Sequence, residues 1–320
     1  MQTAFFACAT THPFSIISSS GVRNASQVYI LHPEFSGFIK HLPIISQDIV
    51  DGANTMVAAL RSRGMIKNVT FADVLNELRL RPLSETDTIA CLKWWINVTN
   101  QENNSHHRHR ESWQLLDALV VSITEPPKMM KMSDTRMFLN FTTDGTIILA
   151  VGPLSNTLVP TSISRSFEPD VLTSVFPWKQ LSIVDWLGFV TDPKVAAANA
   201  DLDVTRSARW AERVLTVLTR AWSSLDEADK KGVIRILSPM SCIPTSTGLK
   251  IPNQTYFFSA NSLTRFRDLP IVTMPSGAIV EGTLEKVLQS LGVRKYVELY
   301  LIFDRSAPSL LRVRLTKLGN

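Results

Sequence analysis

The sequence has 320 residues, of which 45% are hydrophobic and 19% are charged. This balance excludes a disordered chain because it allows a sizeable packed core, and the length favours about two domains. A net charge of +5 is modest for this length, and it is more typical of a solvated surface than of a dedicated nucleic-acid-binding or membrane-binding protein.

The three cysteines, Cys8, Cys91 and Cys242, lie far apart and include no CxxC pair. This spacing indicates neither a structural zinc site nor a disulfide framework, so we expect reduced thiols in an intracellular protein of the cytoplasm or nucleus. The N-terminal segment lacks the basic start and the long apolar run of a signal peptide. No stretch approaches the roughly 18 uncharged apolar residues of a membrane span, so no membrane association is expected.

Residues 1–83 are predicted to form a first small module. A glycine turn is followed by an extended stretch with a tyrosine and by a Leu-Pro step that keeps the backbone extended. A helix over residues 48–63 comes next and ends at a glycine. The residues of this pattern are Gly21, Tyr29, Leu42, Pro43 and Gly64. Thr70 is placed to cap a second short helix.

Residues 84–237 are predicted to form a mainly helical middle. Its elements, in chain order, are a helix opened by Ser84 and ending near residue 98, a polar surface loop over 101–112, a helix over 111–123, a β-hairpin near 138–151, a proline-rich connector over 152–169, and helices over 181–190, 205–225 and 226–237. The Asp144-Gly145 pair is the turn signal for the hairpin. The helix over 205–225 has the clearest apolar stripe.

Residues 238–305 repeat the pattern of the first module. Residues 245–271 align without a gap on residues 18–44 and are identical at seven of 27 positions. The corresponding signature residues are Gly248, Tyr256, Leu269, Pro270 and, at the end of a helix predicted over 280–291, Gly292. A second short helix is expected near Val297. The paired positions mark either a binding groove or the packing core of a repeated module.

Sequence motifs for catalysis are missing. There is no phosphate-binding glycine motif, no HExxH, no GxSxG and no kinase motif. We therefore expect no catalytic residue, no cofactor and no metal ion. The run from His106 to Arg110 contains imidazoles, which are good metal ligands, but it lies in a polar stretch without a cysteine, and a solvated loop is the simpler interpretation.

Two further sets of residues have both a functional and a structural interpretation. Four arginines lie at near-helical spacing opposite the apolar stripe of the helix over 205–225: Arg206, Arg209, Arg213 and Arg220. They form either a site for phosphates or an acidic partner, or a solvated helix face partly paired with Glu212. The tryptophans are more typical of core packing than of base stacking, because most lie on amphipathic helices. They are Trp94, Trp95, Trp113, Trp178, Trp186, Trp210 and Trp222.

The second copy, from Cys242 to Tyr256 and again at Leu291-Gly292-Val293, resembles sacsin-type repeats. Further stretches resemble a fungal family of large proteins similar to sacsin and the plant NO VEIN protein; these are Arg209–Glu212, Ile234–Pro239, Leu269–Val272 and Gly282–Val287. In that family a long domain of unknown function follows an N-terminal histidine-kinase/chaperone-type ATPase domain. The resemblance implies that residues 5–305 lie in the domain of unknown function and that the ATPase lies outside this chain. Residues 306–320 depart from the pattern as an atypical tail, so we expect a fragment of a longer protein.

Together these features predict an α+β fold, predominantly α, in which two small sacsin-repeat-like modules flank a helical middle with one β-hairpin. The favoured function is a non-catalytic scaffold segment that binds protein partners or clients and is coupled to the ATPase of a chaperone-like parent. A nucleic-acid-binding module that uses the basic helix face is the alternative. A metal-dependent or hydrolytic enzyme is a third hypothesis.

Overall fold

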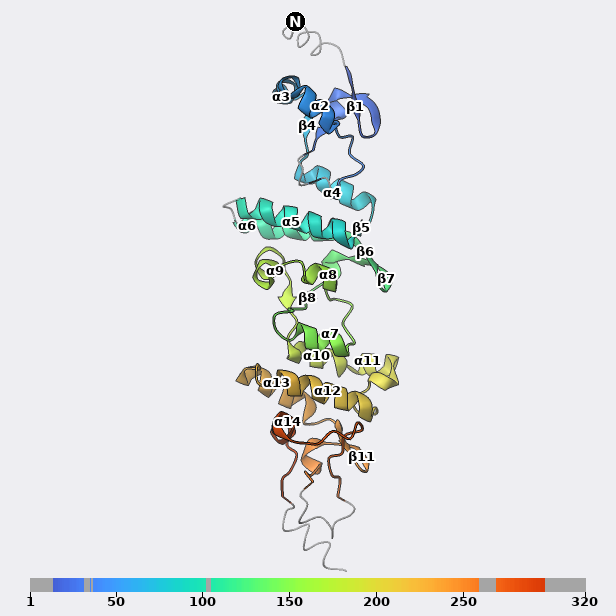
Figure 1. Ribbon diagram of the computed structural model, residues 1–320, viewed down its shortest axis with the longest axis vertical. Helices are drawn as coiled ribbons and strands as arrows, with labels where there is room; N and C mark the ends of the chain where they lie inside the picture. The colour runs from blue at the N-terminus through green and yellow to red at the C-terminus, as the bar shows by residue number, and fades with distance from the viewer. Residues whose placement is uncertain (1–13, 32–34, 36, 102–104, 259–268, 297–320) are drawn as a thin grey trace, which may run out of the picture. The chain divides into compact units, whose positions relative to one another are not determined.

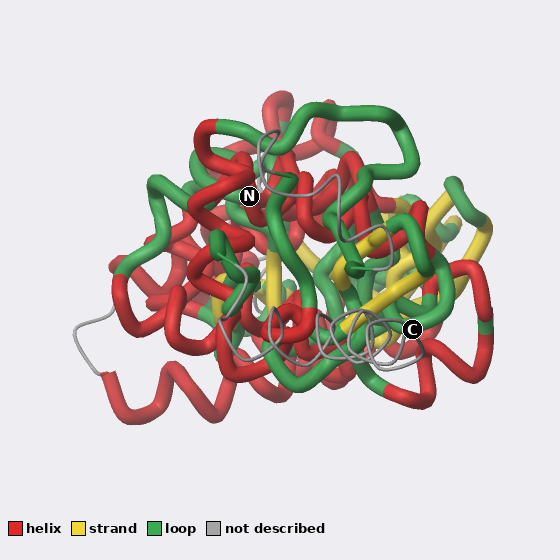
Figure 2. The backbone as a smooth tube through the Cα atoms, turned by 90° about the horizontal axis from the view of Figure 1, so that it is seen from below, coloured by secondary structure: helices red, strands yellow, loops and turns green. Residues whose placement is uncertain are grey.

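The computed structural model describes residues 14–31, 35, 37–101, 105–258 and 269–296. Helices dominate and strands are short, which confirms the predicted α+β, predominantly α fold class (Figure 2). The chain forms two compact units: unit 1 takes Met1–Asn140 and Asn156–Gln180, and unit 2 takes Phe141–Ser155 and Leu181–Asn320. The division of the sequence into segments 1–83, 84–237, 238–305 and 306–320 is based on the repeat and not on spatial contacts, and it stays a prediction. Within the described ranges, no helix combines the length and the apolar character needed to cross a bilayer.

The first module of unit 1 is built from a hairpin, a short parallel strand pair and two helices (Figure 1). Its elements are β1 (Ser15–Ser18), β2 (Gly21–Asn24), the 3-10 turn η1 (Ala25–Gln27), β3 (Tyr29–Ile30), α2 (Gln47–Gly52), α3 (Asn54–Ser62) and β4 (Lys67–Asn68). Strand β1 pairs antiparallel with β2, and β3 pairs parallel with β4. The helix predicted over 48–63 is divided at Ala53, which leaves the helical conformation at φ −131° and ψ 36°. Gly52, which has low helix propensity, directly precedes the break.

The rest of unit 1 surrounds a large hydrophobic core. Its elements are α4 (Phe71–Leu80), β5 (Leu83–Ser84), α5 (Glu85–Gln101), α6 (Ser105–Ala118), β6 (Val120–Thr124), β7 (Pro127–Lys131), η3 (Met132–Asp134), β8 (Met137–Phe138), α8 (Thr161–Ser164), α9 (Pro169–Val175) and β9 (Lys179–Gln180). Thr70 caps α4 as predicted, because its side chain accepts from the backbone of Asp73 and the Asp73 side chain accepts in return. Helices α5 and α6 are tied together in the core, where Trp95 Nε1 donates to Ser112 Oγ at 2.8 Å.

Three predictions for the middle of the chain are wrong. The β-hairpin predicted near 138–151 is a helix, α7 (Gly145–Val151), and the hairpin of this region is β6–β7. The run Ile147 to Val151 is apolar without strict alternation, and periodicity alone does not distinguish a buried strand from a buried helix in so short a run. The helix predicted over 111–123 ends at Ala118, because the β-branched residues that follow pair as β6. The loop predicted over 101–112 is helical from Ser105 onward.

Unit 2 is organised around α12 (Ala208–Ala221), the helix with the clearest predicted stripe. The other elements are α7, α10 (Ile183–Val190), α11 (Pro193–Ala198), η4 (Ala200–Leu202), α13 (Glu227–Leu237), β10 (Ile243–Thr245), β11 (Gly248–Lys250), η5 (Pro252–Gln254) and α14 (Gly282–Leu291). Helix α12 packs against α7, β10 and α14. Its predicted core residues are buried, as expected: Ala211, Val214, Leu215 and Leu218, with Trp222 and Leu225 beyond its end.

The two copies of the repeat share the backbone pattern of the hairpin, the tyrosine strand and the glycine that ends the helix. They differ at residues 279–281, which are not helical, although their counterparts 49–51 lie in α2. The hairpin glycine has positive φ in each, 92° at Gly21 and 97° at Gly248. The tyrosine N–H donates to the carbonyl of the Leu-Pro proline, at 2.8 Å from Tyr29 and 3.0 Å from Tyr256. The carbonyl before the tyrosine accepts from the chain beyond the helix, from Lys67 at 3.1 Å in one copy and Arg294 at 2.9 Å in the other. The short helix predicted near Val297 lies outside the described residues.

Candidate functional site

The four predicted arginines lie on the solvent side of α12 and its approach. Arg209, Arg213 and Arg220 are exposed at positions i, i+4 and i+11, so they form one row along the helix. Arg206 precedes the helix, is 75% exposed, and pairs with Asp203 at 3.3 Å between Nε and Oδ2. With the described part of the chain, the other three arginines form no ion pair within 4.0 Å. We call Arg209, Arg213 and Arg220 the arginine row.

The predicted pairing of this row with Glu212 is wrong. The Glu212 carboxylate instead accepts hydrogen bonds from the backbone N–H of Ser276, at 3.1 Å, and from its hydroxyl. Glu212 therefore fastens the segment 274–280 onto α12. The three arginines of the row are left without an ion-pair partner among the residues that the structure describes.

An apolar hollow of about 230 Å³ runs beside the arginine row. It lies between α12 and the segment that Glu212 fastens, and its lining residues are Glu212, Leu215, Thr216, Thr219, Arg220, Met274, Ala278 and Leu284. Arg220 belongs to both the row and the hollow. The floor is hydrophobic, and the rim carries the Arg220 guanidinium and the Glu212 carboxylate, of which the carboxylate is already bonded to Ser276. The free positive charge suits a ligand that presents apolar side chains beside carboxylates.

A second hollow, of about 440 Å³, continues on the other side of the same segment and shares Met274 and Ala278 with the first. Among the residues that line it, Ile279 is 77% exposed and Phe258 is 71% exposed. Exposed apolar side chains that cluster beside a concave surface are typical of binding sites. We call the two hollows together the α12 groove.

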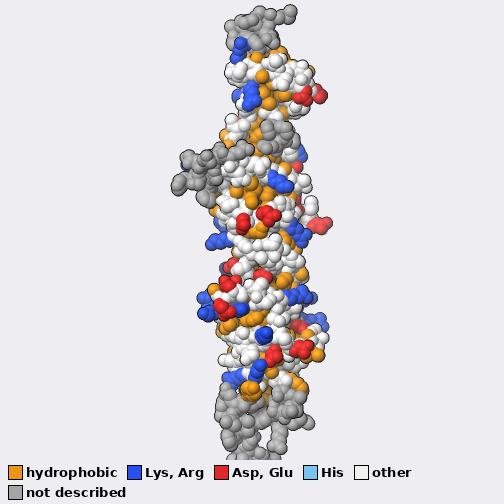
Figure 3. Space-filling model, turned by 60° about the vertical axis from the view of Figure 1, so that its left-hand side comes forward, with side chains coloured by type: hydrophobic (Ala, Val, Ile, Leu, Met, Phe, Trp, Pro, Cys, Tyr) orange, Lys and Arg blue, Asp and Glu red, His pale blue; other side chains and the backbone are white. Residues whose placement is uncertain are grey.

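Charges of both signs are interspersed on the face shown in Figure 3, among hydrophobic side chains, and no broad area of one sign stands out. A nucleic-acid surface normally gathers Lys and Arg into a continuous stripe or patch. Six of the seven tryptophans are buried in the core, so they provide no stacking platform. The exception is Trp113, which is 37% exposed and lies under the Arg136 guanidinium, 5.4 Å from the ring centroid.

The signature residues of the first module hold local structure together. Tyr29 Oη donates to Asp73 Oδ1 at 3.0 Å, which joins the repeat strand to the capping box of α4. Burial and this bond to the carboxylate raise the pKa of Tyr29 above its ordinary value. Burial alone would raise the pKa of Asp73, but hydrogen bonds from Thr70 and Tyr29 outweigh it and lower that pKa. Leu42 and Pro43 are half-buried.

The signature residues of the second module follow the same scheme. Tyr256 and Leu269 are buried, and Pro270 is half-buried beside them. The helix-ending glycines have positive φ in both copies, 69° at Gly64 and 111° at Gly292. Most of these signature side chains pack inside their module. The α12 groove is not lined by any signature residue of the first module.

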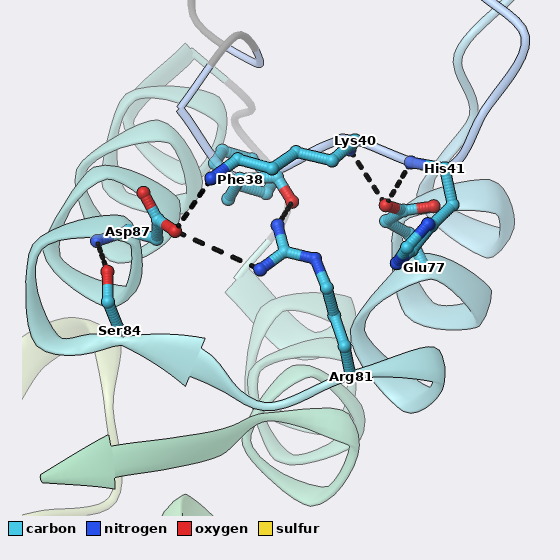
Figure 4. Close-up of polar contacts among 7 residues, drawn as sticks. All are labelled: Phe38, Lys40, His41, Glu77, Arg81, Ser84 and Asp87. Atoms are coloured by element: carbon cyan, nitrogen blue, oxygen red, sulfur yellow. Dashed lines mark hydrogen bonds and ion pairs between the residues drawn. The ribbon is translucent and has the colours of Figure 1, made fainter. Parts of the chain in front are cut away.

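Sequence reasoning missed a cluster of charged residues in unit 1 (Figure 4). Glu77 lies on α4 with only 1% of its surface exposed, and its Oε1 accepts from the backbone N–H groups of Lys40 at 2.8 Å and His41 at 2.6 Å. Arg81 Nη2 donates to the carbonyl of Phe38 at 2.9 Å. The signal was present in the sequence, because Glu77 stands among Val74, Leu75 and Leu78 on the apolar face of its helix.

A second carboxylate completes this cluster. Asp87 Oδ2 lies 3.3 Å from Lys40 Nζ and 3.9 Å from Arg81 Nη1, and the Asp87 N–H donates to Ser84 Oγ at 3.1 Å. Glu77 Oε2 and Arg81 Nε have no hydrogen-bond partner among the described residues. The hydrogen bonds of Glu77 and Arg81 hold the backbone just before the Leu-Pro step, and Asp87 adds ion pairs to Lys40 and Arg81, so we assign this cluster a structural role.

The described cysteines supply no reactive group to the α12 groove or to the Glu77 cluster. Cys91 and Cys242 are buried, and burial raises the pKa of both thiols, that of Cys242 to about 12. The side chains from His106 to His109, like Cys8, lie outside the described residues. In the described part of the chain, no group of three or more His, Cys, Asp and Glu side chains is arranged to hold a metal ion.

Comparison with known proteins gives a family and no further relative. No curated protein and no solved structure matches this chain. A family model described as "Protein of unknown function (DUF3684)" matches residues 1–310, which is nearly the whole chain. The chain therefore belongs to the DUF3684 family of proteins of unknown function.

Proposed function

We propose that this chain is a non-catalytic, protein-binding scaffold segment, and that the α12 groove holds an acidic, amphipathic segment of a partner protein. The observation that carries the proposal is the arginine row, three exposed charges without a described ion-pair partner, one of which, Arg220, lines an apolar hollow. A charged rim around a hydrophobic floor is the usual anatomy of a protein-binding surface.

The length of the arginine row indicates the length of the partner segment. Arg209 and Arg220 are 11 positions apart on one helix, which places them about 16 Å apart along its axis. A partner helix of about 15 residues spans this distance, with carboxylates facing the row and leucine or phenylalanine side chains entering the hollow. The exposed Ile279 and Phe258 extend the apolar surface that such a helix would cover.

Nucleic-acid binding is the second candidate, because a row of arginines also suits phosphates. Three features favour the protein partner: the apolar floor beside the row, the mixed charges of Figure 3, and the burial of most tryptophans. Salt separates the two candidates. Binding of a phosphate backbone weakens steeply with salt, whereas a complex that rests partly on apolar burial retains much of its affinity.

The test uses a fluorescent peptide of about 15 residues that forms a helix with glutamates on one face and leucines on the next, and a single-stranded oligonucleotide. Anisotropy is measured at about 50 and 200 mM salt. The double charge reversal Arg213→Glu with Arg220→Glu is expected to lower peptide affinity at least about tenfold. Arg235→Glu is the matched control, because Arg235 is an exposed arginine on the neighbouring helix α13, outside the groove.

A second pair of variants tests the hollow itself. Ala278 is exposed and lines both hollows, so Ala278→Trp fills the groove without disturbing the core, while Ala278→Ser leaves it open. We expect the tryptophan variant to lose peptide binding and the serine variant to keep it. Strong, salt-sensitive oligonucleotide binding that falls in the charge-reversal variant, with no peptide binding, would instead establish the nucleic-acid function.

We further propose that the chain works inside a cell as part of a larger, chaperone-like protein whose ATPase domain lies outside this chain. The support is the sequence resemblance to the sacsin-like fungal family and the shared backbone of the two repeats. The genomic sequence immediately upstream tests this proposal, because an open reading frame that encodes an ATPase domain is expected there. The non-catalytic assignment is tested by metal analysis of the purified protein, since a stoichiometric metal ion would favour the enzyme hypothesis.

A further inference from the structure

The two repeat hairpins differ in how their apolar cross-strand pair is covered. In β1–β2, Ile17 lies opposite Val22, and in β10–β11 the equivalent pair is Pro244 and Leu249. Ile17 is 63% exposed and Val22 is 69% exposed. Pro244 is buried and Leu249 is half-buried. The same position of the same fold is therefore open in one module and covered in the other.

Helix α12 is what lies on the hairpin of the second module. It contacts both β10 and α14 with its apolar side. In the first module, no described helix packs on β1 or β2 in a comparable way. The module thus has a hairpin face built like that of β10–β11 without the helix that this face receives in unit 2.

The helices beside the two hairpins can be aligned in the same way. Leu60 and Leu288 are equivalent, because each accepts a hydrogen bond from the residue after the helix-ending glycine, at 2.9 Å from Met65 and 3.0 Å from Val293. This alignment places Met56 at the position of Leu284. Met56 is 37% exposed on α3, and Leu284 is half-buried on α14, which packs on α12.

The alignment of the two repeats places these residues on one side of the first module. Since β10 and α14 both contact α12, their counterparts β1 and α3 present a common face by the shared fold of the repeat. Exposed Ile17, Val22 and Met56 are large apolar side chains, and a group of this kind on one face is typical of an interaction surface. We call this face the open hairpin face.

We propose that the open hairpin face binds an amphipathic α-helix of a partner polypeptide, in the manner in which α12 lies on β10 and α14. The chain itself supplies the template for the occupant. Its contacting stripe is formed by small and medium apolar residues, as in α12, where Ala211, Val214 and Leu218 are buried. This surface belongs to unit 1 and does not involve the α12 groove, so the proposal is independent of the proposed function.

The test uses the full chain and a labelled synthetic peptide with the sequence of residues 203–226, which carries the α12 stripe. The chain's own α12 keeps its place in unit 2, because an attached segment has a large effective concentration over a free peptide. We expect binding by anisotropy, and a loss of at least about tenfold in affinity in the variant Ile17→Asp with Val22→Asp, given the apolar area that the two side chains offer. Ile17→Thr with Val22→Thr keeps the β-branched shape and is expected to retain part of the affinity.

Two controls make the result decisive. A peptide with Val214→Asp and Leu218→Asp is expected not to bind, because its stripe is broken. Equal binding of both peptides, no binding of either, or unchanged affinity in the aspartate variant would overturn the proposal. Thermal melting distinguishes the remaining case: the aspartate variant should melt as the wild type does, and a clear fall in Tm would show that the chain itself already covers this face.

Discussion

Replacing Glu77 with alanine is expected to destabilise unit 1 by about 2–5 kcal/mol, and the reason lies in two backbone groups. Glu77 Oε1 accepts hydrogen bonds from the N–H groups of Lys40 and His41, at 2.8 and 2.6 Å, and the side chain is only 1% exposed. A hydrogen bond to a charged group contributes about 1.5–3 kcal/mol, and each donor left buried without a partner costs a similar amount. Partial access of water to the freed donors sets the lower end of this range.

The matched variant is Glu77→Gln, which keeps an acceptor oxygen of the same reach. We expect it to cost about 1 kcal/mol, because the acceptor is then neutral and its bonds are weaker. For a domain of this size, 1 kcal/mol corresponds to a shift of about 2–4 °C in Tm. The alanine variant should therefore melt clearly below the glutamine variant in a thermal scan followed by circular dichroism.

Hydrogen exchange locates the effect. The amides of Lys40 and His41 should exchange faster in Glu77→Ala than in the wild type, while amides of unit 2 should be unchanged. An alanine variant that melts within about 1 °C of the wild type, with both amides still protected, would refute the assignment of Glu77 as the clamp of this segment.

Three further predictions follow from the geometry. Asp73→Asn should destabilise the protein by about 1 kcal/mol at neutral pH through loss of the capping box. Because the pKa of Asp73 is lowered in the folded protein, the difference in stability between wild type and variant should persist above about pH 4 and shrink as the pH falls below it. Urea unfolding at several pH values measures this difference. Gly21→Ala and Gly248→Ala should each cost about 1–2 kcal/mol from positive φ alone, since no atom crowds either added Cβ, and unequal costs would argue against equivalent turns. In a Cys8→Ser chain, Cys91 and Cys242 should resist thiol reagents at pH 8 until the protein unfolds, and labelling of the native protein at the rate of a free thiol would contradict their burial.

The sequence was sufficient where a local pattern agreed with the packing around it. The stripe of α12 repeats with helical spacing for its full length, so both its position and its buried face were predictable. Thr70 was predictable as a cap because the hydrogen bonds of a capping box join residues only three positions apart. The paired glycines of the repeat were predictable because few other residues adopt a positive φ without strain.

Prediction failed where contacts distant in sequence decide the outcome. Asp144-Gly145 fits a hairpin turn, but Gly145 and Ile148 are buried on one side of a helix that packs on α12. Glu77 looked like an ordinary helix glutamate, and its partners lie 36 and 37 positions earlier. The arginine row was found by its spacing, but the apolar hollow beside it needs the segment 274–280, which Glu212 holds across 64 positions.

The central claim is that the α12 groove receives an acidic, amphipathic segment of a partner protein, and hydrogen–deuterium exchange with the helical glutamate-leucine peptide tests it most directly. Bound peptide should slow exchange in α12 and in residues 269–284, and this protection should disappear when Arg213 and Arg220 are both changed to glutamate. Protection confined to other segments, or protection that survives the charge reversal, would contradict the claim.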